Sequence, residues 1–233
     1  MLNSHQKKVV IFGDSILKPV VLNDNFKYVF SKEIDWENIE KELNVKLENR
    51  CRMGATIKHG VVYISEYLKT NDKFFAAVIA YGGNDTDYNW RQVSDDGASI
   101  HYPNTKLDDF EAMLNEIIDL LNEKKIRPIL VTLPPISSIK YFQWIMKNGL
   151  NEENIMRHLG DIETIARHQE MYNNVVLKIA YSRKIKLVDI RKEFLDSPIY
   201  MSLMCEDGIH PNTAGGQLIV DTFIKRFKQK TKK

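Results

Sequence analysis

Two short stretches near opposite ends of the chain carry residue types that could catalyse acyl transfer. Residues 13–15 read GDS, and residues 206–212 read EDGIHPN, which places Asp207 three residues before His210. A serine hydroxyl becomes an effective nucleophile when an imidazole takes its proton, and a carboxylate usually holds that imidazole in the required tautomer. The spacing therefore predicts Ser15 as the nucleophile, His210 as the general base and Asp207 as the residue that orients it.

Acyl transfer also needs hydrogen-bond donors for the negative oxygen of the tetrahedral intermediate, and each such donor is worth about 3–4 kcal/mol. Two further loops offer donors, because RMGATI contains Gly54 and GGND contains Asn84. We expect the backbone N–H groups of Ser15 and Gly54, together with the side-chain amide of Asn84, to form the oxyanion hole.

The sequence shows no cluster of His, Cys, Asp or Glu with metal-ligand spacing, so we expect neither a metal nor a cofactor.

Each of these residues also has a purely structural interpretation. Ser15 could cap a helix, as serines that follow a strand often do. His210 could be an ordinary turn residue, and Asn84 could bond to its own backbone within a turn. Glu206 is an alternative carboxylate partner for His210, although a separation of three residues suits Asp207 better.

Other residues have weaker claims to a functional role. Asp14 and Asp85 are expected to brace their loops by accepting hydrogen bonds from backbone N–H groups. His101 could touch a substrate, whereas solvated side chains are expected for the histidines on helical patterns, His59, His158 and His168. Cys51 and Cys205 are expected to be two buried thiols, with a redox disulfide between them as the alternative. Aromatic side chains that could wall a substrate cleft are Tyr88, Trp90, Tyr102, Tyr141, Phe142 and Trp144.

The elements that would position these groups alternate between strands and helices. The predicted strands are Lys8–Phe12, Val45–Cys51, Phe74–Tyr81, Pro128–Leu133 and Ile185–Ile190. Most are continuous apolar runs, which is typical of strands covered on both faces in a parallel sheet. Helical patterns lie between them and at the end, at Asp35–Leu43, at 106–125, from about Asp161, and after Asn212. This alternation predicts a doubly wound parallel sheet.

The topology explains why distant residues should meet. In an open parallel sheet, ligands bind beyond the carboxyl ends of the strands, and the loops that carry Ser15, Gly54, Asn84 and His210 each follow a predicted strand.

Two segments depart from a simple strand–helix frame. Pro19–Ser31 is predicted to be a small hairpin, and Thr86–Lys106 is predicted to be a long loop with little periodicity, which favours a functional role.

Composition sets the remaining limits. A chain of 233 residues suits a single domain over residues 1–233. The formal net charge of +2 gives no reason to expect a nucleic-acid partner, and the basic tail is expected to be a solvated helix end. No apolar run is long enough for a membrane span, and the N-terminal residues lack the apolar stretch of a signal peptide. With only two cysteines, these features favour a cytoplasmic protein without a membrane partner.

The four blocks FGDSI, RMGATI, GGND and DGIHPN, in this order, resemble those of the SGNH hydrolases, a branch of the GDSL esterase/lipase family. The resemblance implies a three-layer α/β/α sandwich of the flavodoxin-like type, with a five-stranded parallel sheet of order 2-1-3-4-5. It also implies the same roles for Ser15, Asp207, His210, Gly54 and Asn84, and hydrolysis of carboxylic esters, thioesters or acetylated sugars without a metal.

The expected function is therefore that of a serine hydrolase. We expect it to cleave short acyl or acetyl esters of a sugar or small metabolite through an acyl-enzyme intermediate. Two alternatives remain open at this point. One is thioesterase or lysophospholipase-type activity at the same site, and the other is a non-catalytic binding module. The sequence does not indicate an oligomeric state.

Overall fold

A parallel β-sheet forms the centre of the structure, which is a computed structural model describing residues 6–228. The first five residues and the last five, including the end of the basic tail, lie outside the described range. Within it the sheet has five strands in the order β4-β1-β5-β6-β7, all parallel. Their bounds are β1 Lys7–Gly13, β4 Val45–Asn49, β5 Ala76–Ala80, β6 Arg127–Val131 and β7 Lys186–Val188. This confirms the predicted 2-1-3-4-5 order of a three-layer sandwich.

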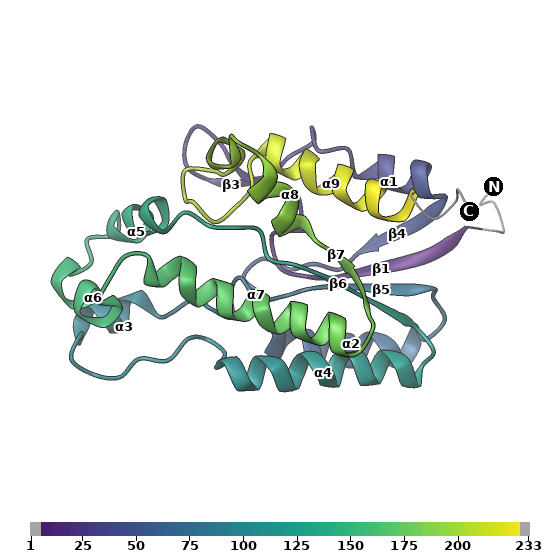
Figure 1. Ribbon diagram of the computed structural model, residues 1–233, viewed down its shortest axis with the longest axis horizontal. Helices are drawn as coiled ribbons and strands as arrows, with labels where there is room; N and C mark the ends of the chain where they lie inside the picture. The colour runs from purple at the N-terminus through teal and green to yellow at the C-terminus, as the bar shows by residue number, and fades with distance from the viewer. Residues whose placement is uncertain (1–5, 229–233) are drawn as a thin grey trace.

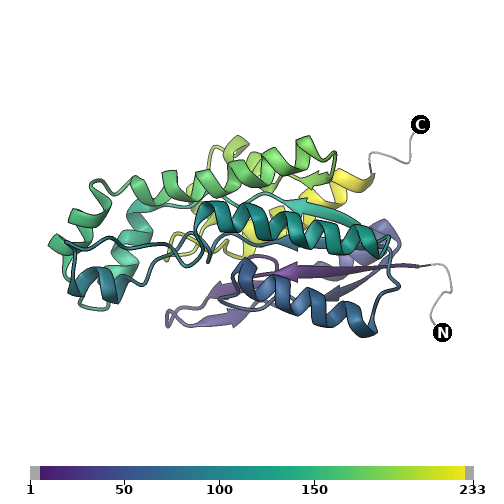
Figure 2. The ribbon, with the colours of Figure 1, turned by 90° about the horizontal axis from the view of Figure 1, so that it is seen from below.

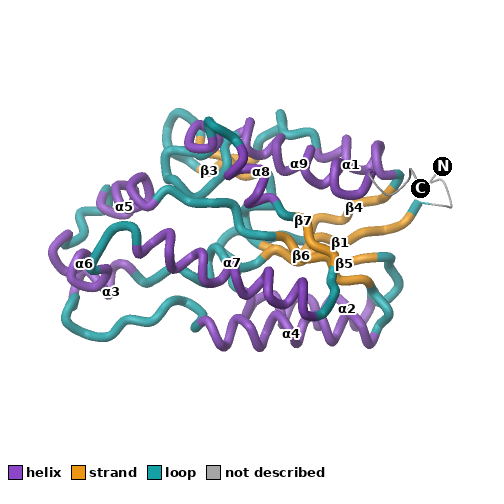
Figure 3. Tube along the Cα trace, in the orientation of Figure 1, coloured by secondary structure: helices purple, strands orange, loops and turns teal. Residues whose placement is uncertain are grey.

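Helices cover both faces of the sheet (Figure 1). On one face lie α2 Ile57–Thr70, α4 Leu107–Glu123 and α7 Thr164–Ser182, and on the other lie α1 Trp36–Leu43, α8 Ile190–Asp196 and α9 Thr213–Lys228. Side chains of β1 alternate between the two cores, with Val10 and Phe12 in one and Val9 and Ile11 in the other. Figure 3 shows the strands enclosed between the two helical layers.

Capping side chains begin two of the predicted helices where the sequence indicates. Asp35 accepts a hydrogen bond from the backbone N–H of Asn38 at the start of α1 (3.0 Å), and Asn212 accepts one from the N–H of Gly215 at the start of α9 (3.1 Å). The short helix α8 and a 3-10 turn at Tyr200–Leu203 complete the C-terminal half.

A third, smaller apolar cluster lies beyond the carboxyl ends of the strands. It consists of α3 Trp90–Asp95, α5 Ser138–Met146, α6 Glu152–Leu159 and the start of α7, seen at the left of Figure 1. The prediction of a long irregular loop at Thr86–Lys106 was therefore wrong in part, because α3 lies inside it. A helix of six residues has too few turns for its apolar spacing to stand out.

The predicted hairpin is present. Strands β2 Val20–Leu22 and β3 Tyr28–Phe30 pair antiparallel and form a separate two-stranded sheet. Figure 2 shows this hairpin extending past the carboxyl end of the central sheet. It therefore lies at the edge of the sheet where the catalytic loops were expected to meet.

Candidate active site

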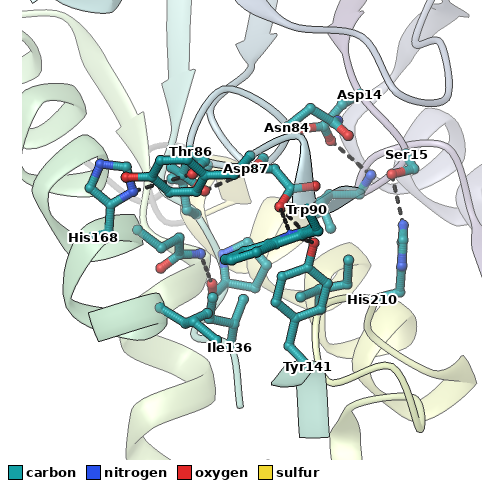
Figure 4. Close-up of a pocket in the computed structure, with 18 of the residues that line it drawn as sticks. Asp14, Ser15, Asn84, Thr86, Asp87, Trp90, Ile136, Tyr141, His168 and His210 are labelled. Carbon is teal, nitrogen blue, oxygen red and sulfur yellow. Dashed lines mark hydrogen bonds between the residues drawn. The ribbon is translucent and has the colours of Figure 1, made fainter. Parts of the chain in front are cut away.

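Ser15 lies on the turn that directly follows β1. The turn is fixed at both sides, because the N–H of Asp14 donates to the carbonyl oxygen of Ala80 (3.2 Å) and the Asp14 carboxylate accepts from the N–H of Ile16 (2.9 Å). The Oγ atom of Ser15 is 2.8 Å from Nε2 of His210, and both side chains are buried (Figure 4). The structure thus brings together a hydroxyl and an imidazole that are 195 residues apart in the chain.

Asp207 holds the other side of the imidazole. Its Oδ2 atom is 2.7 Å from Nδ1 of His210, and its Oδ1 atom accepts from the N–H groups of Ile209 and His210 (both 3.0 Å). Burial opposes ionisation of this carboxyl, but the hydrogen bond and the charge of His210 outweigh it and lower its pKa. A Nδ1 proton held by Asp207 leaves Nε2 free to accept the proton of Ser15, which is the arrangement that serine activation needs.

Glu206, the alternative carboxylate, faces away from this arrangement. Its side chain is mostly exposed and pairs with Lys140 at 3.7 Å. The reason lies in the turn itself, where Gly208 adopts a left-handed conformation (φ +74°) and directs Asp207 back toward His210.

Among the three expected oxyanion donors, Asn84 and Gly54 differ in their position relative to Ser15. Asn84 lies in the cavity beside Ser15, and its side-chain amide donates to the carbonyl oxygen of Ala55 (3.3 Å). Gly54 is adjacent to Ala55 on an exposed turn at φ +69°, and it does not line the cavity. The structure therefore brings Asn84 into one cavity with Ser15 and His210, whereas Gly54 lies outside the lining of that cavity.

Asp14 and Asp85 brace the loops as expected. Asp85 is fully buried, and both of its oxygens accept from the N–H of Ile57 at the start of α2 (2.9 and 3.1 Å). Burial raises the pKa of Asp14 to about 7 and the pKa of Asp85 to about 6. Both carboxyl groups therefore lie in surroundings that disfavour their charged form.

A small cavity of about 80 Å³ opens beside the Ser15–His210 pair. Its walls are mainly apolar and come from the strand ends and from the third cluster, including Leu133, Ile136, Leu159, Ile165 and Ile209. Ser15 and His210 are themselves part of its lining.

Several polar residues of this cavity had no signal in the sequence. Asp87 is half-buried and accepts hydrogen bonds from Nε1 of Trp90 (2.7 Å) and from the Tyr141 hydroxyl (2.6 Å), as Figure 4 shows. Gln169 donates to the carbonyl oxygen of Pro134 (2.7 Å). Nothing in their spacing marks these residues, because their roles depend on the packing of α3, α5 and α7 against one another.

The prediction of a solvated side chain was wrong for His168. This histidine is half-buried in the cavity wall, and its Nδ1 donates to the carbonyl oxygen of Thr86 (3.2 Å). Burial lowers its pKa and that of His158, whose ring contacts Tyr88. The polar face of α7 is covered by the Thr86–Tyr88 segment, which a sequence pattern could not show. His101 packs against His158 and does not line the cavity, while His59 is exposed.

The predicted aromatic wall is formed by half of its candidates. Tyr88, Trp90 and Tyr141 line the cavity. The other three are Tyr102, which is exposed, Phe142, which is buried in the third cluster, and Trp144, which packs against the hairpin. Cys51 and Cys205 are both buried and free, so the disulfide alternative is not realised.

One contact to the His210–Asp207 pair comes from the hairpin and was not predicted. The Tyr28 hydroxyl donates to Oδ2 of Asp207 (3.1 Å), and the Tyr28 ring lies over His210 with a centroid separation of 4.9 Å.

Within residues 6–228, no group of three or more His, Cys, Asp or Glu side chains is placed to hold a metal ion. In the same range, no helix combines the length and the apolar character that crossing a membrane requires.

A model of the GDSL-like lipase/acylhydrolase family matches residues 11–218. Sequence comparison with curated proteins gives no match.

Solved structures with the same fold include a lipase/acylhydrolase from Enterococcus faecalis, which is 17% identical with a TM-score of 0.67, the alignment covering 96% of each chain. A catalytic mutant of an acetylxylan esterase from Geobacillus stearothermophilus is 18% identical with a TM-score of 0.66, covering 95% of this chain and 94% of that one. A GDSL-like lipase from Bacteroides thetaiotaomicron is 16% identical with a TM-score of 0.62, covering 96% and 88%.

Proposed function

The chain belongs to the GDSL-like lipase/acylhydrolase family, and from that premise we propose that it is a serine hydrolase. It cleaves short acyl or acetyl esters of a sugar or small metabolite through an acyl-enzyme intermediate. The observation that carries the proposal is the 2.8 Å separation between Ser15 Oγ and His210 Nε2. The small apolar cavity beside that pair supports a short acyl group.

In the proposed mechanism, Ser15 Oγ attacks the ester carbonyl carbon while His210 Nε2 takes the hydroxyl proton. Asp207 holds the Nδ1 proton and stabilises the imidazolium that forms. The tetrahedral oxyanion is bound by the N–H groups of Ser15 and Gly54 and by the Asn84 amide. His210 then returns the proton to the leaving alcohol, and water, activated by the same imidazole, hydrolyses the acyl-enzyme.

Gly54 can take this role although it lies outside the cavity lining. Its turn is joined to Asn84 through the carbonyl oxygen of Ala55 (3.3 Å). Catalytic hydrogen bonds are often long or poorly aligned before substrate binds.

A sugar ester is one substrate of the proposed class. One structural neighbour is an acetylxylan esterase, and the acetyl group of such a substrate is small enough for the cavity described above. Thioesterase or lysophospholipase-type activity would use the same nucleophile and base. A panel of acetylated sugars, short esters, acyl thioesters and lysophospholipids, measured as kcat/KM, ranks these substrate classes.

The first test uses p-nitrophenyl acetate and butanoate with the native protein and Ser15→Ala. We expect Ser15→Ala to lose at least about 10³-fold in kcat, because removing the nucleophile leaves only binding and oxyanion stabilisation. The matched control is Ser182→Ala, which changes an exposed serine at the end of α7 and should keep the native rate. Equal rates for the native protein and Ser15→Ala would overturn the proposal and favour a non-catalytic binding module.

A further inference from the structure

The hairpin between β1 and α1 contributes a side chain to the Asp207–His210 pair. Tyr28, the first residue of β3, pairs with Leu22 across the hairpin. Its hydroxyl donates to Asp207 Oδ2 at 3.1 Å, and its ring lies over the imidazole of His210. Tyr28 is 38% exposed, whereas Asp207 is completely buried. The tyrosine therefore lies between the carboxylate and the solvent.

This contact completes the hydrogen bonding of the carboxylate. An ionised carboxylate has about four acceptor sites. Oδ1 of Asp207 accepts from two backbone N–H groups, and Oδ2 accepts from His210 Nδ1 and from the Tyr28 hydroxyl. Two donors thus share Oδ2, and one of them is the imidazole that the proposed reaction protonates.

Sharing one oxygen has two physical consequences. The tyrosine fixes the rotation of the carboxylate, because Oδ2 must satisfy both donors at once. It also takes up part of the negative charge on Oδ2 and so weakens the attraction between Asp207 and a protonated His210. Burial and the negative charge of Asp207 raise the pKa of Tyr28, so the hydroxyl keeps its proton and remains a donor.

We infer that Tyr28 is a positioning residue for the proposed reaction, in which its hydroxyl orients Asp207 and moderates the pull of that carboxylate on His210. The inference rests on the proposed function. It also gives the hairpin a role, since the hairpin replaces the helix that usually follows the first strand of such a sheet.

Other ionisable groups face the same pair and must be considered in any pH study. Asp14 interacts with His210 from the turn after β1, and Cys205 interacts with Asp207 from within the same loop. Asp87 lies close enough to influence Tyr28 from the loop after β5. A single Tyr28 substitution leaves these three groups in place, so a change between variants reports on the hydroxyl.

The sharpest variant is Tyr28→Phe, which removes the hydroxyl and keeps the ring that covers His210. The ring continues to exclude water from Asp207, so the lost donor is not replaced. We expect the bond between His210 Nδ1 and Asp207 to strengthen. The low-field ¹H NMR resonance of the Nδ1 proton, assigned by its absence in His210→Gln, should then move further downfield.

The second readout is the pH dependence of kcat/KM. A stronger hold of Asp207 on protonated His210 should move the acid limb of the profile to higher pH, by roughly 0.5 unit or more for the loss of one hydrogen bond to a charged group. Tyr28→Leu, which removes the ring as well, should also lower kcat. Tyr181→Phe is the control, because that tyrosine is exposed on α7, and it should change neither readout.

The two readouts separate this inference from the proposed function. The NMR resonance requires no turnover, so it tests the role of Tyr28 even if Ser15→Ala shows that the protein is not an esterase. If Tyr28→Phe leaves both the resonance and the acid limb unchanged, the inference is wrong. A loss of rate with both readouts unchanged would overturn it equally, because the hydroxyl would then support only the fold.

Discussion

Asp14 precedes Ser15 in the chain and is almost completely buried. Burial raises its pKa to about 7, against about 3.9 for an exposed aspartate. Between these two values the folded protein binds more protons than the unfolded chain, so the contribution of Asp14 to stability falls as pH rises. The carboxyl group next to the nucleophile therefore costs stability at neutral and alkaline pH.

This cost predicts the effect of Asp14→Asn. The amide keeps an oxygen for the N–H of Ile16 and removes the buried charge. We expect the free energy of unfolding to rise by about 1 kcal/mol or more at pH 8 and by clearly less at pH 5, since one pKa unit corresponds to about 1.4 kcal/mol. Urea unfolding at both pH values measures it. As a control, Asp24→Asn, at an exposed hairpin position, should change the free energy of unfolding by the same small amount at both pH values. A change for Asp14→Asn that is equally small and independent of pH would contradict the prediction.

Single residues also show the limits of a sequence pattern. His168 and His158 lie on helices whose outward faces were expected to be solvated, yet both are partly covered by the segment around Tyr88. Asp207 and Glu206 are neighbours in the chain, and spacing favoured the residue that the structure places against His210. Spacing succeeds for a contact made within one turn and fails for a contact made between two helices.

At the scale of elements, the turn that carries Asp207 and His210 depends on its support from α5. The N–H of Ser137 donates to the carbonyl oxygen of Gly208 (2.8 Å). A methyl group on Gly208 would lie 2.7 Å from Cβ of Lys140 and 2.9 Å from the carbonyl oxygen of Ser137. Gly208 therefore allows both the left-handed backbone and the close approach of two segments.

Gly208→Ala should consequently affect both stability and activity. Its matched control is Gly149→Ala, because Gly149 has a similar φ (+67° against +74°) and no described atom within 4 Å of an added methyl group. We expect Gly149→Ala to lower the free energy of unfolding by about 1 kcal/mol, the cost of a left-handed alanine, with a native kcat. Gly208→Ala should lose more stability and at least about 10-fold in kcat, because the turn must shift to relieve the contacts. Thermal unfolding and ester hydrolysis measure both effects, and equal behaviour of the two variants would refute the role of close packing.

Strands and helices with strong local signals were predicted well, whereas four short helices were not. The strands and the helices α1, α4 and α9 have caps or sustained apolar spacing that identify them. Helices α3, α5, α6 and α8 have six to nine residues each, so most of their stability comes from the surfaces they pack against.

At the scale of the whole molecule, the cavity lies between the edge of the sheet and the third cluster. Leu159 and Ile155 are both on α6 and both belong to that cluster, but only Leu159 lines the cavity. Truncating each of these two residues therefore distinguishes an effect of cavity size from an effect of the stability of the cluster.

Leu159→Ala should broaden the acyl specificity, and Ile155→Ala should not. Both truncations are expected to cost about 2–5 kcal/mol, as buried Leu or Ile to Ala changes usually do. We expect only Leu159→Ala to raise the ratio of kcat/KM for octanoate to that for butanoate esters, by roughly 10-fold, because extra space is worth about 1–3 kcal/mol per methylene. An equal octanoate-to-butanoate ratio in the two variants would show that the acyl group does not bind against Leu159.

By itself, the sequence determined the type of sheet, the four loops at its carboxyl edge and the chemistry that their residues could do. These depend on local patterns and on the rule that parallel strands end at one edge of the sheet. Tertiary structure alone decided that Ser15 and His210 lie 2.8 Å apart across 195 residues, that Gly54 lies outside the cavity lining, and that Tyr28 reaches Asp207. Such distances follow from the packing of whole elements against one another, and no local pattern contains that information.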